Sequence, residues 1–241
     1  MPEQSGLTLS SLDPRHAATL RQIVLQQEID AATGLLAESI RLIRDHAPEN
    51  GSLDPLFACL SMAMERLLKL TIGLHAVESQ QAWPTKKVMQ KTFGHNIVKL
   101  WTEVQTILAS RAPHSTHEPL VREALANAEN DPILPTVIGA MDAYARDGRY
   151  HRLDLLADSI APDDSPGRLW EKIQHTVAAA DPEVVTRTLN SDLTAWERAT
   201  ATAIENAIMA WFHAIHCSWI QGSIGDTARR LSALLRYPSP G

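Results

Sequence analysis

The chain has 241 residues, of which 44% are hydrophobic and 21% charged, and its formal net charge at pH 7 is −6. This length and composition are typical of a globular protein with a substantial buried core. The acidic balance excludes a bulk electrostatic attraction to nucleic acid or to anionic lipid, and it leaves open only local basic patches.

The sequence has no run of about 18 uncharged apolar residues, which a membrane-spanning helix would need. Its N-terminus, Met-Pro-Glu-Gln-Ser-Gly, lacks the basic and apolar regions of a secretory signal. Cys59 and Cys217 lie far apart in apolar helical patterns, which is typical of buried thiols in a reducing compartment. We therefore expect a bacterial cytoplasmic protein without a membrane span.

Helix boundaries are the clearest local signal. Asp or Ser can accept the free N–H groups of a first helical turn, and a following proline loses a donor that had no partner. Asp-Pro or Ser-Pro dipeptides begin at Asp13, Asp54, Asp131, Ser165 and Asp181. Together with helical apolar periodicity, they predict helices over residues 14–45, 55–77, 96–110, 119–127, 134–146, 166–179, 182–221 and 226–235. Residues 149–155 are expected to be irregular or weakly extended, and Pro135 leaves the start of the fifth helix open.

Two of these helices define the expected architecture. The helix over 182–221 would extend about 60 Å at 1.5 Å per residue. The helix over 55–77 carries a wide apolar stripe that includes Leu60, Leu67 and Leu74, so we expect it to lie at the centre. The prediction is an all-α, up-and-down bundle of about seven to nine helices with two very long helices. We expect one domain over 1–241, with a first helical half over 14–127 and a second over 131–236.

The second quarter of the chain carries a family resemblance. Glu65-Arg-Leu-Leu-Lys69, followed by Gly94-His95-Asn96-Ile-Val-Lys-Leu100, resembles HEPN-like helical proteins of bacteria. The resemblance covers about 50 residues, and the motifs are short and rich in leucine. It implies a helical bundle that is often dimeric and that recurs in toxin–antitoxin and phage-defence systems. Many members are metal-independent endoribonucleases with an Arg, a following polar residue and a nearby His, and others are binding modules without that pair.

A candidate for that pair is Arg146-Asp-Gly-Arg-Tyr-His151. Imidazole can move the proton of a ribose 2′-hydroxyl, and guanidinium can offset charge on the phosphate. The candidate catalytic residues are therefore Arg146, His151 and Asp147, with Arg149 and Tyr150 as binding residues. Against this, Asp147-Gly148 is typical of a helix end, so Arg146 and His151 need not share a face.

The Arg-to-His spacing itself has little specificity, because roughly two such pairs are expected by chance in a chain of this composition. Similar pairs occur at Arg41/His46, Arg111/His117 and Arg168/His175. His95 and Asn96 are further candidate binding residues. At a helix start they would also serve a structural purpose, by accepting from free N–H groups or by fixing a neighbouring helix.

His213, His216 and Cys217 have the spacing of metal ligands on one helical face. A zinc site would need a fourth ligand, for which Cys59 or His75 would have to serve. Half-buried packing among tryptophans accounts better for the pattern, so we expect no metal and no cofactor.

Two functions compete on the sequence alone. The first is a non-catalytic HEPN-like interaction or regulatory module, and the alternative is a metal-independent endoribonuclease of toxin or phage-defence type that uses Arg146 and His151. A metal-binding bundle around His213 and His216 is a third option. In each case we expect a homodimer, with RNA or another protein as partner.

Overall fold

The computed structural model describes residues 13–45, 52–146, 156, 165–180, 186 and 193–238. Within these ranges the chain forms helices and turns, without a strand, which confirms the all-α prediction. The elements are α1 (Pro14–Asp45), α2 (Asp54–Gln80), the π-helical turn η2 (Val88–Phe93), α3 (Ile97–Arg111), the short turn η3 (Ala112–His114), α4 (Glu118–Glu129), α5 (Leu134–Arg146), α7 (Pro166–Ala180), α9 (Leu193–Ile220), α10 (Asp226–Leu231) and the short turn η5 (Ser232–Leu234).

Local capping explains where α1, α3 and α5 begin, whereas α2 begins at Asp54 without a side-chain cap, although Asp54-Pro55 was one of the predicted boundary pairs. Asp13 Oδ1 accepts the N–H of Arg15 at the start of α1, and Asn96 caps α3 by accepting the N–H of Lys99 at 2.7 Å. Asp131 accepts the N–H groups of Ile133 and Leu134 ahead of α5. Pro135 is therefore the second residue of α5, where its missing N–H costs no helical hydrogen bond.

Most predicted boundaries agree with the structure within three residues. The predicted ranges 14–45 and 134–146 coincide with α1 and α5, and α2 extends three residues beyond the predicted end at 77. The helix predicted over 182–221 is described as α9 from Leu193 to Ile220, and most of residues 182–192 lie outside the described ranges. The predicted helix 226–235 is divided into α10 and η5, and the π-helical turn η2 was not predicted.

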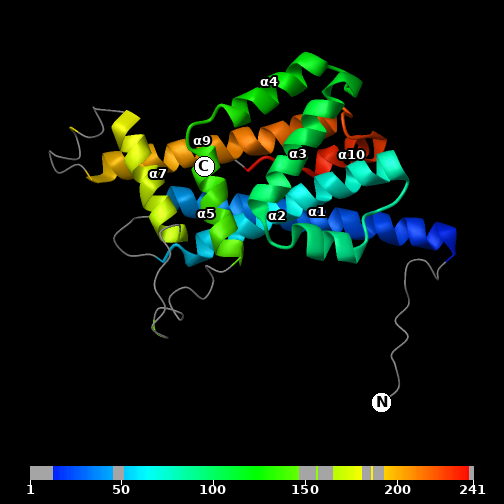
Figure 1. The fold of residues 1–241 in the computed structure, drawn as a ribbon, viewed down its shortest axis with the longest axis horizontal. Helices are drawn as coiled ribbons and strands as arrows, with labels where there is room; N and C mark the ends of the chain where they lie inside the picture. Colours follow the sequence, from blue (N-terminus) through cyan, green and yellow to red (C-terminus); the bar gives the residue numbers. More distant parts are fainter. Residues whose placement is uncertain are drawn as a thin grey trace.

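Figure 1 shows α1, α2 and α9 running along the long axis, with α3 and α5 crossing them steeply. Helix α2 packs against α1, α3, α5 and α10, and its stripe at Leu60, Leu67 and Leu74 is fully buried. This confirms α2 as the central helix. No helix among the described residues is long and apolar enough to cross a membrane.

The core also contains a polar link between the central helix and α9. Trp219 Nε1 donates to the hydroxyl of Thr71 at 3.1 Å, and both side chains are fully buried. On the surface of α2, the segment after Gln80 turns back over the helix and reaches η2, which leaves a hollow between α1, α2 and this segment.

Candidate functional site

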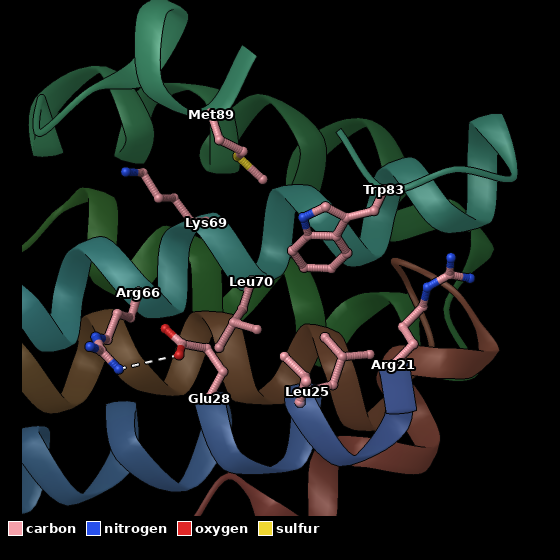
Figure 2. A pocket seen from close by; sticks show the side chains of 9 residues that line it. Arg21, Leu25, Glu28, Arg66, Lys69, Leu70, Trp83 and Met89 are labelled. Atoms are coloured by element: carbon pink, nitrogen blue, oxygen red, sulfur yellow. Dashed lines mark hydrogen bonds and ion pairs between the residues drawn. The ribbon is translucent and has the colours of Figure 1, made fainter. Parts of the chain in front are cut away.

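The hollow beside η2 is the site with the clearest binding character, and we call it the α1–α2 groove (Figure 2). Its volume is about 390 Å³, within the range of about 300 to 1,000 Å³ of small-molecule sites. Helix α1, helix α2 and the segment around η2 each supply part of the lining. The lining residues are Arg21, Val24, Leu25, Glu28, Arg66, Lys69, Leu70, Trp83 and Met89.

The floor and one wall of the groove are apolar. Leu25 and Leu70 are buried between the two helices, while the half-buried Trp83 and Met89 pack onto the core from above. Trp83 lies directly on Gly73 of α2, where a Cβ atom would overlap the indole ring. Glycine at this position therefore allows the aromatic ring to rest on the helix backbone and to form the wall.

The rim is charged and mainly positive, with the three cations Arg21, Arg66 and Lys69 against the single carboxylate Glu28. Arg66 pairs with Glu28 at 3.3 Å, and both side chains are about 40% exposed (39% and 42%). Lys69 donates to Glu65 at 2.6 Å and to the Gly94 carbonyl at 2.7 Å. Arg21 has neither an ion pair nor a hydrogen bond in the described part of the chain.

The mostly buried carboxylate of Glu65 holds the Lys69 part of this rim in place. The side chain of Glu65 is only 14% exposed, and it contacts Lys69 and His95, whose Nδ1 lies 3.0 Å from Oε2. Burial by itself would raise the pKa of Glu65, but the hydrogen bonds from Lys69 and His95 outweigh it and lower that pKa. His95 thus links the start of α3 to α2, next to Asn96, which caps α3.

The arginine of the candidate catalytic pair has a partner on its own helix. Arg146 contacts Asp142 through Nε at 2.8 Å and through a terminal nitrogen at 2.7 Å. The Asp142 side chain is only 5% exposed, and its other oxygen accepts the N–H of Val98 at 3.2 Å. The guanidinium is therefore held beside the first turn of α3 by a carboxylate that is itself fixed.

The other residues of that candidate site, Asp147, Arg149, Tyr150 and His151, lie outside the described residues, as does the whole of the segment 149–155. Of the residues singled out from the sequence, the structure brings His95 and Asn96 close to the groove through Glu65 and Lys69. It describes Arg146 at the opposite end of α5 from the Asp131 cap.

A second cavity of about 460 Å³ lies between α4, α9 and the C-terminal residues, and it contains His213, His216, Cys217 and Tyr237. The His213 ring contacts the Tyr237 hydroxyl through Nδ1. The His216 ring is stacked against Phe212 and meets the Tyr237 ring edge to face, with centroids 4.7 Å apart. Burial, together with the nearby His213, lowers the pKa of His216 to about 4, so its imidazole is neutral at pH 7.

No group of three His, Cys, Asp or Glu side chains in the described ranges is placed to hold a metal ion. His216 contacts the rings of Phe212 and Tyr237, and the exposed His213 contacts Tyr237, whereas the sequence predicted half-buried packing among tryptophans. Cys59 and Cys217 are free thiols, and burial raises the pKa of both.

None of the nine residues that line the groove was among the candidate site residues from the sequence, although Arg66 and Lys69 lie in a stretch that carries the family resemblance. One signal pointed in their direction, because residues 81–100 contain four lysines and no acidic residue in a chain of net charge −6. Such a local excess of cations marks a surface suited to an anion.

No family model matches the chain, and searches of curated proteins and of solved structures find no similar protein.

Proposed function

We propose that this chain is a non-catalytic, HEPN-like regulatory module of the bacterial cytoplasm, and that it acts by binding an apolar group in the α1–α2 groove. The observation that carries the proposal is the groove itself. It has a ligand-sized volume, a floor of Leu25 and Leu70, and an aromatic wall formed by Trp83. Mostly apolar concave sites with a few polar groups at the rim are the common form of small-molecule sites.

The geometry of Arg146 favours this function over the ribonuclease alternative. In that alternative, the Arg146 guanidinium would have to meet a phosphate, but it already forms two contacts with Asp142. Both contacts go to the same oxygen of a nearly buried carboxylate, and this ion pair neutralises the charge that would stabilise a transition state. The endoribonuclease with Arg146 and His151 remains the alternative proposal. A homodimer and an RNA or protein partner are part of both proposals.

The proposal is tested with a neutral apolar fluorophore, N-phenyl-1-naphthylamine, whose emission rises in an apolar site. The wild-type chain should bind it. Val24, which is 56% exposed and lines the groove, is changed to Glu. A carboxylate there should weaken binding by about tenfold, which corresponds to about 1.4 kcal/mol.

The matched control is Ala233→Glu, which places the same carboxylate at an exposed position in a neighbouring groove. This second groove lies between α1, α10 and η5, and it shares Arg21 and Leu25 with the α1–α2 groove. Its affinity for the fluorophore should equal that of the wild type, with unchanged circular dichroism for both variants. The proposal fails if the wild type does not bind the fluorophore, or if both variants weaken binding equally.

A further inference from the structure

The α1–α2 groove has two chemically different ends. Figure 2 shows the Arg66–Glu28 pair at one end, Leu25 and Leu70 in the middle, and Arg21 extending from α1 on the side of Trp83. The charges at the first end, where Figure 2 also shows Lys69, are balanced, because Arg66 pairs with Glu28 at 3.3 Å and Lys69 pairs with Glu65 at 2.6 Å. The Trp83 end carries a guanidinium without a partner among the described residues. The groove therefore changes from neutral to positive along its length.

The charges around the groove favour an anion over a cation. Both nearby carboxylates are already engaged, Glu28 by Arg66 and Glu65 by Lys69 and His95. A bound cation would find no free carboxylate in the groove among the described residues and would face Arg21, whereas a bound anion would pair with a guanidinium that has no partner in the described ranges. The adjoining segment around η2 adds the exposed Lys86, Lys87 and Lys91 without an acidic residue.

The size of the groove indicates a small molecule. Its volume of about 390 Å³ lies near the lower end of the range for ligand sites. A protein partner would require an interface of about 800 Å² on each side, far beyond these nine lining residues.

From this arrangement we infer that the groove binds a small amphiphilic anion, with an aliphatic or aromatic body and one carboxylate or phosphate head group. The head group pairs with the Arg21 guanidinium, and the body lies over Leu25 and Leu70 beneath the Trp83 ring. This inference rests on the proposed function, since it specifies the ligand of the same groove. It assigns Arg21 as the residue that selects for negative charge, a selection that the apolar floor alone would not make.

The test compares ligands of equal chain length and different charge as competitors of N-phenyl-1-naphthylamine. Decanoate, monodecyl phosphate and decyltrimethylammonium are titrated below their micelle-forming concentrations. The anions should displace the fluorophore at about one fifth of the concentration that the cation requires, as expected for one partly exposed ion pair. The two anions distinguish a carboxylate from a phosphate as the preferred head group.

Three variants test which arginine causes the preference for anions over the cation. Arg21→Gln should abolish the preference for the anions, measured within that variant as the ratio of the concentrations at which the anions and the cation displace the fluorophore. Arg15→Gln removes an exposed cation from the same helix outside the groove, and it should keep the preference. Arg230→Gln removes the other arginine of the neighbouring groove between α1 and α10, which Arg21 also lines, and it should keep the preference as well.

Equal displacement by anion and cation, or a preference that survives Arg21→Gln, would overturn the inference while fluorophore binding still supports the proposed function. A preference that is lost in Arg230→Gln would also overturn it, because the ligand would then occupy the other groove. Failure of the wild type to bind the fluorophore at all would refute both proposals together.

Discussion

The polar link between α2 and α9 provides a sharp test of the fold. Thr71 and Trp219 are 148 positions apart and fully buried, and the indole N–H donates to the threonine hydroxyl at 3.1 Å. The same hydroxyl donates to the Leu67 carbonyl at 2.8 Å within α2. Changing Thr71 to Val keeps the shape of the side chain and removes the hydroxyl that accepts the indole N–H.

The expected cost follows from that unmet donor. A buried N–H that loses its partner costs about 1 to 3 kcal/mol, whereas the added methyl group recovers about 0.8 kcal/mol through apolar burial. The difference between these two values predicts that Thr71→Val lowers the free energy of unfolding by about 0.2 to 2 kcal/mol, with a central value of about 1 kcal/mol. The measurement is urea unfolding followed by circular dichroism at 222 nm, with the slope against denaturant unchanged.

A double-mutant cycle isolates the hydrogen bond from general packing effects. In a Trp219→Phe background the donor is absent, so Thr71→Val should cost nothing further, and the coupling between the two positions should be about 1 kcal/mol or more. If Thr71→Val is as stable as the wild type, or if its cost is the same in both backgrounds, then α2 and α9 do not meet through this bond.

Three further predictions concern the groove, the histidines and the catalytic alternative. Gly73→Ala should weaken N-phenyl-1-naphthylamine binding by about fivefold or more, because the methyl group would displace the Trp83 ring. Gly34→Ala, where the added methyl group meets open space, should leave that affinity unchanged. Burial lowers the pKa of His216 from its ordinary 6.5 to about 4. Between these two pH values the unfolded chain therefore binds more protons than the folded chain. The stability that depends on the neutral ring is complete above about pH 6.5 and is lost as the pH falls to about 4. This pKa shift corresponds to a loss of at most about 3.4 kcal/mol in the free energy of unfolding, and partial exposure reduces the expected loss to about 1 to 2 kcal/mol. Urea unfolding of the wild type and of His216→Asn at pH 7 and pH 4.5 would measure it. Purified protein should leave structured RNA intact in EDTA; cleavage that His151→Ala abolishes would instead establish the ribonuclease.

The helices were predictable because their boundaries are encoded locally. Asp13 with Pro14 and Asp131 ahead of α5 satisfy first-turn N–H groups within a few residues, so sequence spacing is sufficient to locate the start. The central position of α2 followed from the width of its apolar stripe, which requires burial on several sides.

The groove was not predictable in the same way, because it depends on an approach between distant segments. From the sequence alone, Gly73 is a glycine that destabilises the interior of a helix. Only the structure shows that Trp83 lies on it and leaves no space for a Cβ atom. The π-helical turn Val88–Phe93 that brings Met89 over the groove likewise has no distinctive sequence signal.

The partner of Arg146 was available in the sequence but is easily overlooked. Asp142 lies four positions earlier on the same helix, a spacing that places the two side chains on one face. The Arg-to-His spacing pairs Arg146 with His151, which follows it in the sequence, whereas the observed ion pair is with Asp142, which precedes it. A candidate catalytic arginine on a helix should therefore be checked for acidic residues one turn before it.

The two stretches that carry the HEPN-like resemblance meet beside the groove. Lys69 lines the groove and bonds both to Glu65 in its own stretch and to the Gly94 carbonyl in the other, while His95 contacts the same carboxylate. Loss of Glu65 would leave the partly buried Lys69 ammonium with one acceptor, the Gly94 carbonyl, and would remove the contact through which His95 links the start of α3 to α2. Because Glu65 holds both Lys69, which lines the groove, and His95, a change at Glu65 should alter ligand binding even though Glu65 does not line the groove.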